Sequence, residues 1–225
     1  MILSIDTSTE VGSLALSSNG KLLTSVELHI KNSHSEFINN AARSLVRYAG
    51  IEFNDLEAVG ISKGPGSYTG LRIGVAFAKG LAFALNIPLL AINSLHLLAM
   101  GLRNNVDHEG FICPMIDARR MEVYTALYNK DLFEILPVHA RIIDQHSFQD
   151  ELNRSKIQFI GNGSDKCREL IKHPNANFSG KWYPNIKEAV KYFQQAFDNQ
   201  QFEDVTYFEP FYLKEFTTKP SKNRL

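Results

Sequence analysis

The chain has 225 residues, of which 44% are hydrophobic and 21% are charged, and its 24 Lys and Arg residues balance its 24 Asp and Glu residues. A chain of this length can bury a substantial core, as one large domain or as two smaller lobes. The formal net charge of zero excludes binding to nucleic acid or membranes through overall charge, so any contact with RNA would be local or made through a partner.

The apolar segments indicate a cytoplasmic protein with no membrane span. The first residues, MILSIDTSTE, lack a basic start, and Asp6 interrupts their apolar run, so we expect no signal peptide. The most apolar window contains Lys79, Asn86 and Pro88, and is too interrupted to cross a membrane. The two cysteines are far apart in sequence, as expected of free thiols in a reducing compartment.

The first half of the chain predicts strands and helices in an order typical of α/β proteins. A strand over 2–5 is followed by two strand-like runs around Asn19-Gly20, a dipeptide typical of tight hairpins, so an antiparallel meander is expected. Helices are predicted over 35–49, 69–85 and 94–103, separated by the apolar strands LEAVGIS and IPLLAI. This alternation calls for parallel strands with right-handed crossovers.

The pattern starts again near residue 111. ILSIDTSTEVGSLAL and CPMIDARRMEVYTAL share an apolar strand, Ile-Asp, a short polar turn, Glu-Val and a strand ending in Ala-Leu. A strand over 157–160 and helices over 164–172 and 186–199 are predicted to follow. The repeat predicts two lobes, each with a mixed sheet that starts with a meander, and the second lobe less complete than the first.

The domain boundaries follow from this repeat. The polar segment NNVDHEG, Asn104 to Gly110, is expected to separate an N-terminal lobe, 1–104, from a C-terminal lobe, 111–216. Residues 217–225 form a basic tail that we expect to be disordered.

The two strand–turn–strand units are the places where a two-lobe fold could bind phosphate. In the first turn, Asp6 and Ser8 are candidates for holding a hydrated metal or an anion, although they could equally cap local backbone. The second turn, DARRM, has no glycine to let backbone N–H groups approach an anion. The scattered histidines show no spacing typical of a metal pair and no Ser/His/Asp or Cys/His arrangement is visible, so we expect no catalytic residue and no metal site.

The helix over 69–85 carries small residues every four positions: Gly70, Gly74, Ala78 and Ala82. Such a stripe lets another helix pack closely. Two alternatives remain open: the helix over 35–49 fills the stripe, or a helix of a partner does. We favour close packing and docking over phosphate binding for the preceding GPGSYTG loop.

At this point the motifs resemble those of a known family. The segments ILSIDTSTEVGSLAL, HSEFI, SKGPGSYTGLRIGVAFAKGLA, IPLLAINSLHLLA, DARRMEVY and EPFYLKEF together resemble the TsaB (YeaZ) family. The resemblance implies an α/β two-lobe fold of the actin/Hsp70/sugar-kinase type. It also implies a cytoplasmic accessory protein for N6-threonylcarbamoyladenosine in tRNA, working with the catalytic paralogue TsaD and the ATPase TsaE.

The chain departs from the catalytic paralogue in two places. Where that paralogue carries a metal-binding H-x-x-x-H pair, this chain has Ser94 and Leu98, and where it has a glycine-rich turn, this chain has DARRM. We therefore expect a non-catalytic subunit with no cofactor, leaving open a contact with ATP or ADP at a partner interface.

The resemblance also implies a docking surface for TsaD, or for a second copy in a homodimer, with tRNA reached only through the complex. The candidate docking residues are Phe37, Ala41, Leu45, Arg72, Gly74, Val75 and Ala78. The alternative functions are an ATP-binding phosphotransferase of the same fold, suggested by Asp6, and a glycoprotease-type peptidase.

Overall fold

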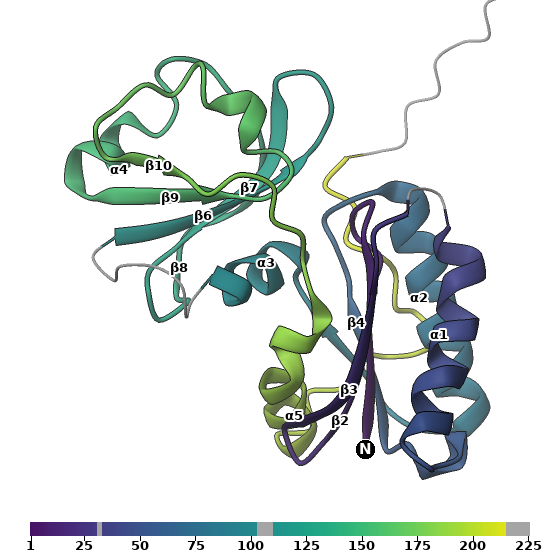
Figure 1. Ribbon diagram of the computed structural model, residues 1–225. Coiled ribbons are helices and arrows are strands. Elements are labelled where there is room, and N and C mark those ends of the chain that lie inside the picture. The colour runs from purple at the N-terminus through teal and green to yellow at the C-terminus, as the bar shows by residue number, and fades with distance from the viewer. Residues whose placement is uncertain (31–32, 103–109, 215–225) are drawn as a thin grey trace, which may run out of the picture.

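The computed structural model describes residues 1–30, 33–102 and 110–214, and contains two five-stranded mixed sheets (Figure 1). The predicted boundary segment lies outside these residues except for Gly110, as does the basic tail, 217–225. Among the described residues, no helix is both long and apolar enough to cross a membrane.

The first sheet has the strand order β3-β2-β1-β4-β5. Its strands are β1 (Ile2–Asp6), β2 (Gly12–Ser18), β3 (Lys21–Leu28), β4 (Ala58–Ser62) and β5 (Leu89–Ile92). The first three strands are antiparallel, and β4 and β5 continue the sheet in parallel. Asn19 and Gly20 both have positive φ, 49° and 69°, as the predicted hairpin requires.

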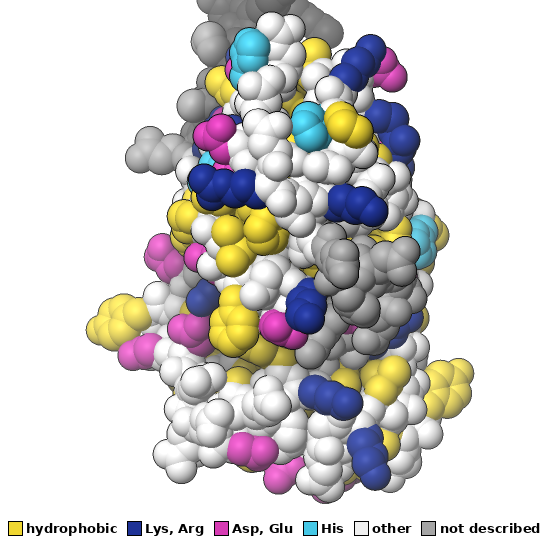
Figure 2. Space-filling model, turned by 90° about the vertical axis from the view of Figure 1, so that its left-hand side faces the viewer, with side chains coloured by type: hydrophobic (Ala, Val, Ile, Leu, Met, Phe, Trp, Pro, Cys, Tyr) yellow, Lys and Arg dark blue, Asp and Glu magenta, His cyan; other side chains and the backbone are white. Residues whose placement is uncertain are grey.

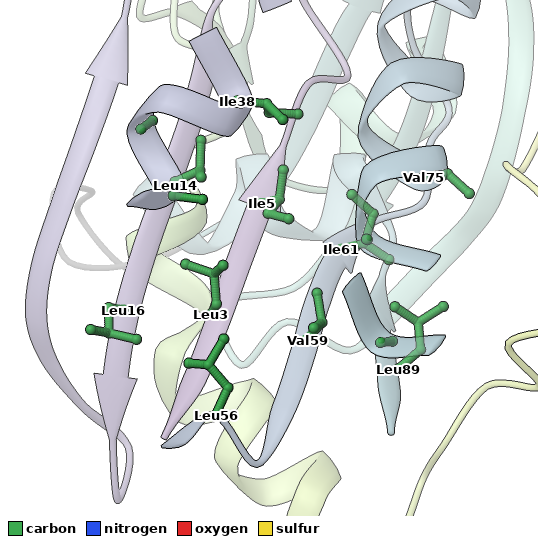
Figure 3. Close-up of a cluster of buried hydrophobic side chains, with 14 of the residues drawn as sticks. Leu3, Ile5, Leu14, Leu16, Ile38, Leu56, Val59, Ile61, Val75 and Leu89 are labelled. Carbon is green, nitrogen blue, oxygen red and sulfur yellow. The ribbon is translucent and has the colours of Figure 1, made fainter. Parts of the chain in front are cut away.

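Two helices cover one face of this sheet: α1 (His34–Tyr48) and α2 (Tyr68–Leu85). The prediction of both helices is confirmed to within one residue, and each ends where a residue with positive φ follows, Gly50 after α1 and Asn86 after α2. Between the helices and the sheet lies an apolar core, part of which Figure 3 shows. A short 3-10 helix, η1 (Phe53–Asp55), precedes β4.

The second sheet repeats this plan, with the order β10-β9-β6-β7-β8. Its elements are β6 (Gly110–Asp117), β7 (Glu122–Tyr128), β8 (Glu134–Ile142), α4 (Gln149–Arg154), β9 (Lys156–Ile160) and β10 (Ala176–Phe178). The strands β6, β7 and β8 form an antiparallel meander, and β9 and β10 continue the sheet in parallel. The predicted repeat and the two-lobe fold class are confirmed, and α3 (Ser94–Leu102) packs between the sheets.

The helix predicted over 164–172 is wrong. The structure has only a short 3-10 helix, η2 (Asp165–Cys167), followed by turns. Most of the backbone bonds here join residues three apart, which is the pattern of 3-10 turns, and Pro174 stops any extension of the segment as a helix.

The chain returns to the first lobe earlier than predicted. The elements η3 (Ile186–Ala189) and α5 (Val190–Asp198) pack on the face of the first sheet opposite α1 and α2. The ring of Phe193 lies where a side chain at Gly60 would be, so that glycine lets α5 sit close to β4. The predicted C-terminal lobe, 111–216, is therefore too long.

Figure 2 shows the side of the molecule that carries α5 and the second lobe, where basic, acidic and apolar side chains are interspersed.

After α5 the chain crosses the edge of the first sheet, where Glu203 pairs with Leu89. Lys79 of α2 then donates to the carbonyls of Thr206 and Phe208, at 3.2 and 2.7 Å. We call residues 201–214 the C-terminal strap.

Candidate functional site

The first turn, between β1 and β2, is closed by the start of α2. Thr7 Oγ1 donates to the carbonyl of Gly70 at 2.8 Å, and the Ser67 N–H donates to the carbonyl of Ser8 at 2.7 Å. A Cβ at Gly66 would overlap the carbonyl oxygen of Ser8, and one at Gly70 would overlap that of Thr7, so both glycines serve close backbone packing. The close packing predicted for the GPGSYTG loop is thus confirmed.

Both candidates in this turn are inside the protein. Asp6 and Ser8 have no exposed surface, and the Asp6 Oδ2 and Ser8 Oγ atoms have no hydrogen-bond partner. Burial raises the pKa of Asp6 to about 6, and the nearby hydroxyls of Ser62 and Ser8 and the Ser8 N–H only partly oppose this. Neither side chain therefore presents an exposed atom to an anion or a hydrated metal.

The second turn, between β6 and β7, is folded around a lysine of the same chain. Arg119 and Arg120 have positive φ, 70° and 49°, and the Lys166 Nζ donates to the carbonyls of Arg120 and Glu122 at 2.6 and 2.7 Å. The same ammonium forms an ion pair with Asp117. The turn therefore presents carbonyl oxygens and a carboxylate to a cation, which is the opposite of what phosphate requires.

The stripe of small residues on α2 packs against the protein's own sheet. A Cβ at Gly74 would overlap Thr7 Oγ1 and lie 3.3 Å from Ile61 Cδ1, and Val75 and Ala78 are at most 3% exposed. The prediction that these residues contact a partner is therefore wrong. At Gly70 and Gly74 neither of the two alternatives for the stripe holds, because the sheet and its first turn fill these positions.

The opposite face of α2 is exposed and mostly apolar. Ala76, Gly80 and Phe83 are exposed, Phe83 by 79%, and a Cβ at Gly80 would meet nothing within 4 Å. Ile73 is half-buried beside them, and Arg72, a predicted docking residue, is exposed on the same face. We call Arg72, Ile73, Ala76, Gly80 and Phe83 the outer face of α2.

The predicted docking residues on α1 lie elsewhere. Phe37, Ala41 and Leu45 line a groove between α1 and the edge strand β3, with a volume of about 550 Å³. The side of α1 turned to solvent is polar, with Asn39 and Arg43 exposed. The structure thus divides the predicted docking residues into a groove, an outer face and a buried set.

Ser94 and Leu98, which replace the metal-binding pair of the catalytic paralogue, form hydroxyl and apolar contacts. Ser94 Oγ is 2.7 Å from Ser62 Oγ, and Leu98 is buried in the core between the lobes. His96 is largely buried, which lowers its pKa. In the described part of the chain, no group of three His, Cys, Asp or Glu side chains could hold a metal ion.

Hydrogen bonds between residues far apart in sequence attach the segment that returns from the second lobe to the first lobe. Tyr183 donates to Glu10 at 2.6 Å, and burial together with this bond raises the pKa of the Tyr183 hydroxyl to about 12. The backbone N–H of Ile186 donates to Ser13 Oγ at 3.0 Å. These partners are more than 170 residues apart in sequence, so no local pattern could have revealed them.

The chain is similar in sequence to a known family model and to proteins that have been characterised. Residues 25–220 match the family model of TsaD, tRNA N6-adenosine threonylcarbamoyltransferase. The tRNA threonylcarbamoyladenosine biosynthesis protein TsaB of Bacillus subtilis (strain 168) is 35% identical over 76% of this chain and 75% of its own length. A tRNA N6-adenosine threonylcarbamoyltransferase of Clostridium perfringens is 29% identical over 84% of this chain and 64% of its own length.

The solved structure of YeaZ from Pseudomonas aeruginosa superposes on this chain with a TM-score of 0.83 at 26% identity. The match covers 94% of this chain and 99% of that one, so the fold corresponds over both lobes.

Proposed function

Because the chain belongs to the TsaB family of tRNA threonylcarbamoyladenosine biosynthesis proteins, we propose that it is a non-catalytic subunit that docks onto TsaD and activates it. A role in tRNA threonylcarbamoyladenosine biosynthesis follows from the family; the docking and the activation are the proposal. In this proposal the protein is cytoplasmic, reaches tRNA only through the complex, joins TsaE there, and pairs with a second copy when TsaD is absent.

The observation that carries the proposal is the outer face of α2. Phe83 is exposed beside a flat centre of Ala76 and Gly80, and a contiguous apolar patch on one face is typical of an interaction site. A flat centre flanked by Ile73 and Phe83 suits the close approach of another helix. TsaD matches the same family model as this chain, so it is a partner expected to have helices in corresponding places.

The two turns support a subunit without catalysis of its own. The first is covered by the start of α2, and the second is folded around Lys166. A contact with ATP or ADP, in this proposal, is made at the interface with the partner and not at these turns.

The test is a substitution at Gly80. Gly80→Arg places a long charged side chain at the centre of the outer face, where nothing stands within 4 Å, so the chain is expected to fold normally. We expect TsaD of the same organism to co-elute with the wild type on size-exclusion chromatography, and the variant to lose this complex together with the stimulation of tRNA modification.

The matched control is Gln195→Arg, which adds the same charge to an exposed position of α5 on the opposite side of the sheet. It should bind TsaD as the wild type does. A stable complex with the Gly80→Arg variant would overturn the docking proposal.

The phosphotransferase alternative rests on Asp6 in the first turn of a two-lobe fold. Isothermal titration of the isolated chain with magnesium and ATP separates the two functions. Micromolar binding with one-to-one stoichiometry, together with turnover, would favour the phosphotransferase, whereas a non-catalytic subunit gives neither.

A further inference from the structure

The strand β3 is an open edge of the first sheet. Among the described residues, its only backbone partner is β2, so the backbone groups on its other side are unpaired by any strand. Leu22 and Leu23 are exposed by 43% and 50%, and charges occur only at Lys21 and Glu27. An edge without proline or a central charge is a template for another extended segment, so natural proteins usually cover such an edge.

The groove along this edge has an apolar floor. Val26 and Leu28 of β3 face Phe37, Ala41 and Leu45 of α1 across the groove of about 550 Å³. This volume lies within the range typical of ligand sites. The groove extends along β3 from Thr24 to Leu28, a stretch of about 16 Å at the usual rise of a strand.

The ends of the groove differ in chemistry. Tyr48, 76% exposed, stands at the end of α1, and Glu36 stands in its first turn. Since a short connection joins β3 to α1, Glu36 lies near the Leu28 end of the strand. Glu36 is the one charged residue among those that line the groove in the described part of the chain.

We infer that this groove binds an extended peptide segment of a partner protein, which adds to β3 as a further strand and carries a lysine or arginine at the Glu36 end. The unpaired backbone of β3 calls for an extended segment, because a helix has no free backbone groups to offer it. Apolar side chains at alternate positions of a strand of about five residues would fill the floor. The carboxylate of Glu36 calls for a cation, which a second copy of this groove does not supply, since it repeats the same carboxylate.

This inference is independent of the proposed docking on TsaD, because it does not use the outer face of α2. It gives Phe37, Ala41 and Leu45, which the sequence singled out as docking residues, a role in a different contact. The failure of TsaD to bind would leave it untouched.

The experiment starts from the full chain and a phage-displayed library of random peptides of about ten residues. We expect enriched peptides that alternate apolar residues and contain a lysine or arginine, with affinities measured by fluorescence polarisation. In hydrogen exchange, binding should protect amides of β3 and leave those of β8 unchanged. A library that yields no binder, or binders that protect other amides, overturns the inference.

Two variants locate the site. Ser44→Trp fills the groove from a half-buried position, and Arg43→Trp places the same bulk on the adjacent exposed position as its control. We expect the first to weaken binding at least about tenfold and the second to change it less than about twofold. If Ser44→Trp fails to fold, Glu36→Lys on the exposed first turn replaces it, with the same expected loss for the basic peptides.

Sedimentation of the wild type tests whether a second copy of the chain, and not a peptide, occupies the groove. A dimer that forms at micromolar concentration and disappears with Ser44→Trp would show that a second copy fills the groove, and would contradict the peptide. Equal peptide binding by Ser44→Trp and Arg43→Trp would contradict it as well.

Discussion

Asp6 shows how a residue that the sequence marks as a candidate for binding a metal or an anion can destabilise the fold. It ends β1 where a two-lobe nucleotide-binding protein could use a carboxylate, yet its side chain is fully buried and one of its oxygens has no partner. The unsatisfied oxygen destabilises the charged form. In its charged form, this buried carboxyl group therefore lowers the stability of the folded chain.

The sign of that effect follows from the pKa. Folding raises the pKa of Asp6 from 3.8 to about 6, so the folded chain binds the proton more tightly than the unfolded chain. Below pH 3.8 the group is neutral in both states and costs nothing. The cost grows as the pH rises through this window and is complete above pH 6, where a shift of about two units corresponds to about 3 kcal/mol.

We therefore predict that Asp6→Asn stabilises the chain at neutral pH. The free energy of unfolding, measured by urea denaturation, should exceed that of the wild type by up to about 3 kcal/mol near pH 7.5, and the difference should fall toward zero as the pH drops below 3.8. Asp144→Asn is the contrasting control, because hydrogen bonds from Ser147 and His146 lower the pKa of that exposed carboxyl. An Asp6→Asn variant that is less stable than the wild type at every pH would refute this reading of Asp6.

At the scale of the element, α2 shows what a sequence pattern can and cannot specify. The four-residue spacing of Gly70, Gly74 and Ala78 correctly predicts a close contact, because only a small residue admits a neighbour so near the helix axis. The spacing does not say what the neighbour is. Ile61 of β4 and Thr7 of the turn after β1 fill the position, so the neighbour is the sheet that α2 covers together with its first turn.

The same limit of sequence patterns explains which other predictions were correct and which were wrong. Helix bounds and the strand repeat were predictable because apolar periodicity and residues such as Asn19-Gly20 act locally. The burial of Gly74, Val75 and Ala78 against the sheet was not predictable, because the pattern cannot tell the face of the helix that meets the sheet from the face that meets solvent. Gly80 lies outside the spaced stripe, so nothing in the sequence marked it as the centre of the exposed face.

The two glycines of α2 provide a matched pair for a stability prediction. Gly80→Ala should raise the free energy of unfolding by up to about 1 kcal/mol, since alanine favours the helix and meets nothing within 4 Å. Gly74→Ala gains the same helix propensity but forces a methyl group into Thr7 Oγ1, so we expect a net loss of about 1–3 kcal/mol. Urea denaturation measures both, and a Gly74→Ala variant as stable as Gly80→Ala would contradict the packing described for α2.

At the scale of the whole molecule, the second lobe is inserted into the first. The chain leaves the first sheet after α3, builds the second sheet, and returns at Ile186 to place α5 on the open face of β1 and β4. The face that α5 covers includes Ile2, Ala15, Ala58 and Leu90, all buried. A chain divided at residue 104, as the repeat in the sequence suggests, would leave this face exposed to water.

This arrangement predicts which fragment of the chain folds. Residues 1–102 joined by a short flexible linker to residues 186–214 should form a stable first lobe, because Gly101 of α3 lies beside Glu188 of η3 and the linker has little distance to span. Residues 1–104 alone should not unfold cooperatively, since the apolar surface under α5 would be open to water.

Both fragments expose the side of α3 that packs on the second lobe, so the difference between them measures the contribution of residues 186–214, which include η3, α5 and the C-terminal strap. Thermal unfolding followed by circular dichroism distinguishes them: the joined fragment should show one cooperative transition, and the shorter one a gradual loss of signal. If residues 1–104 unfolded as cooperatively as the joined fragment, the first lobe would be complete without its returning helix. The boundary suggested by the sequence repeat would then be the physical one.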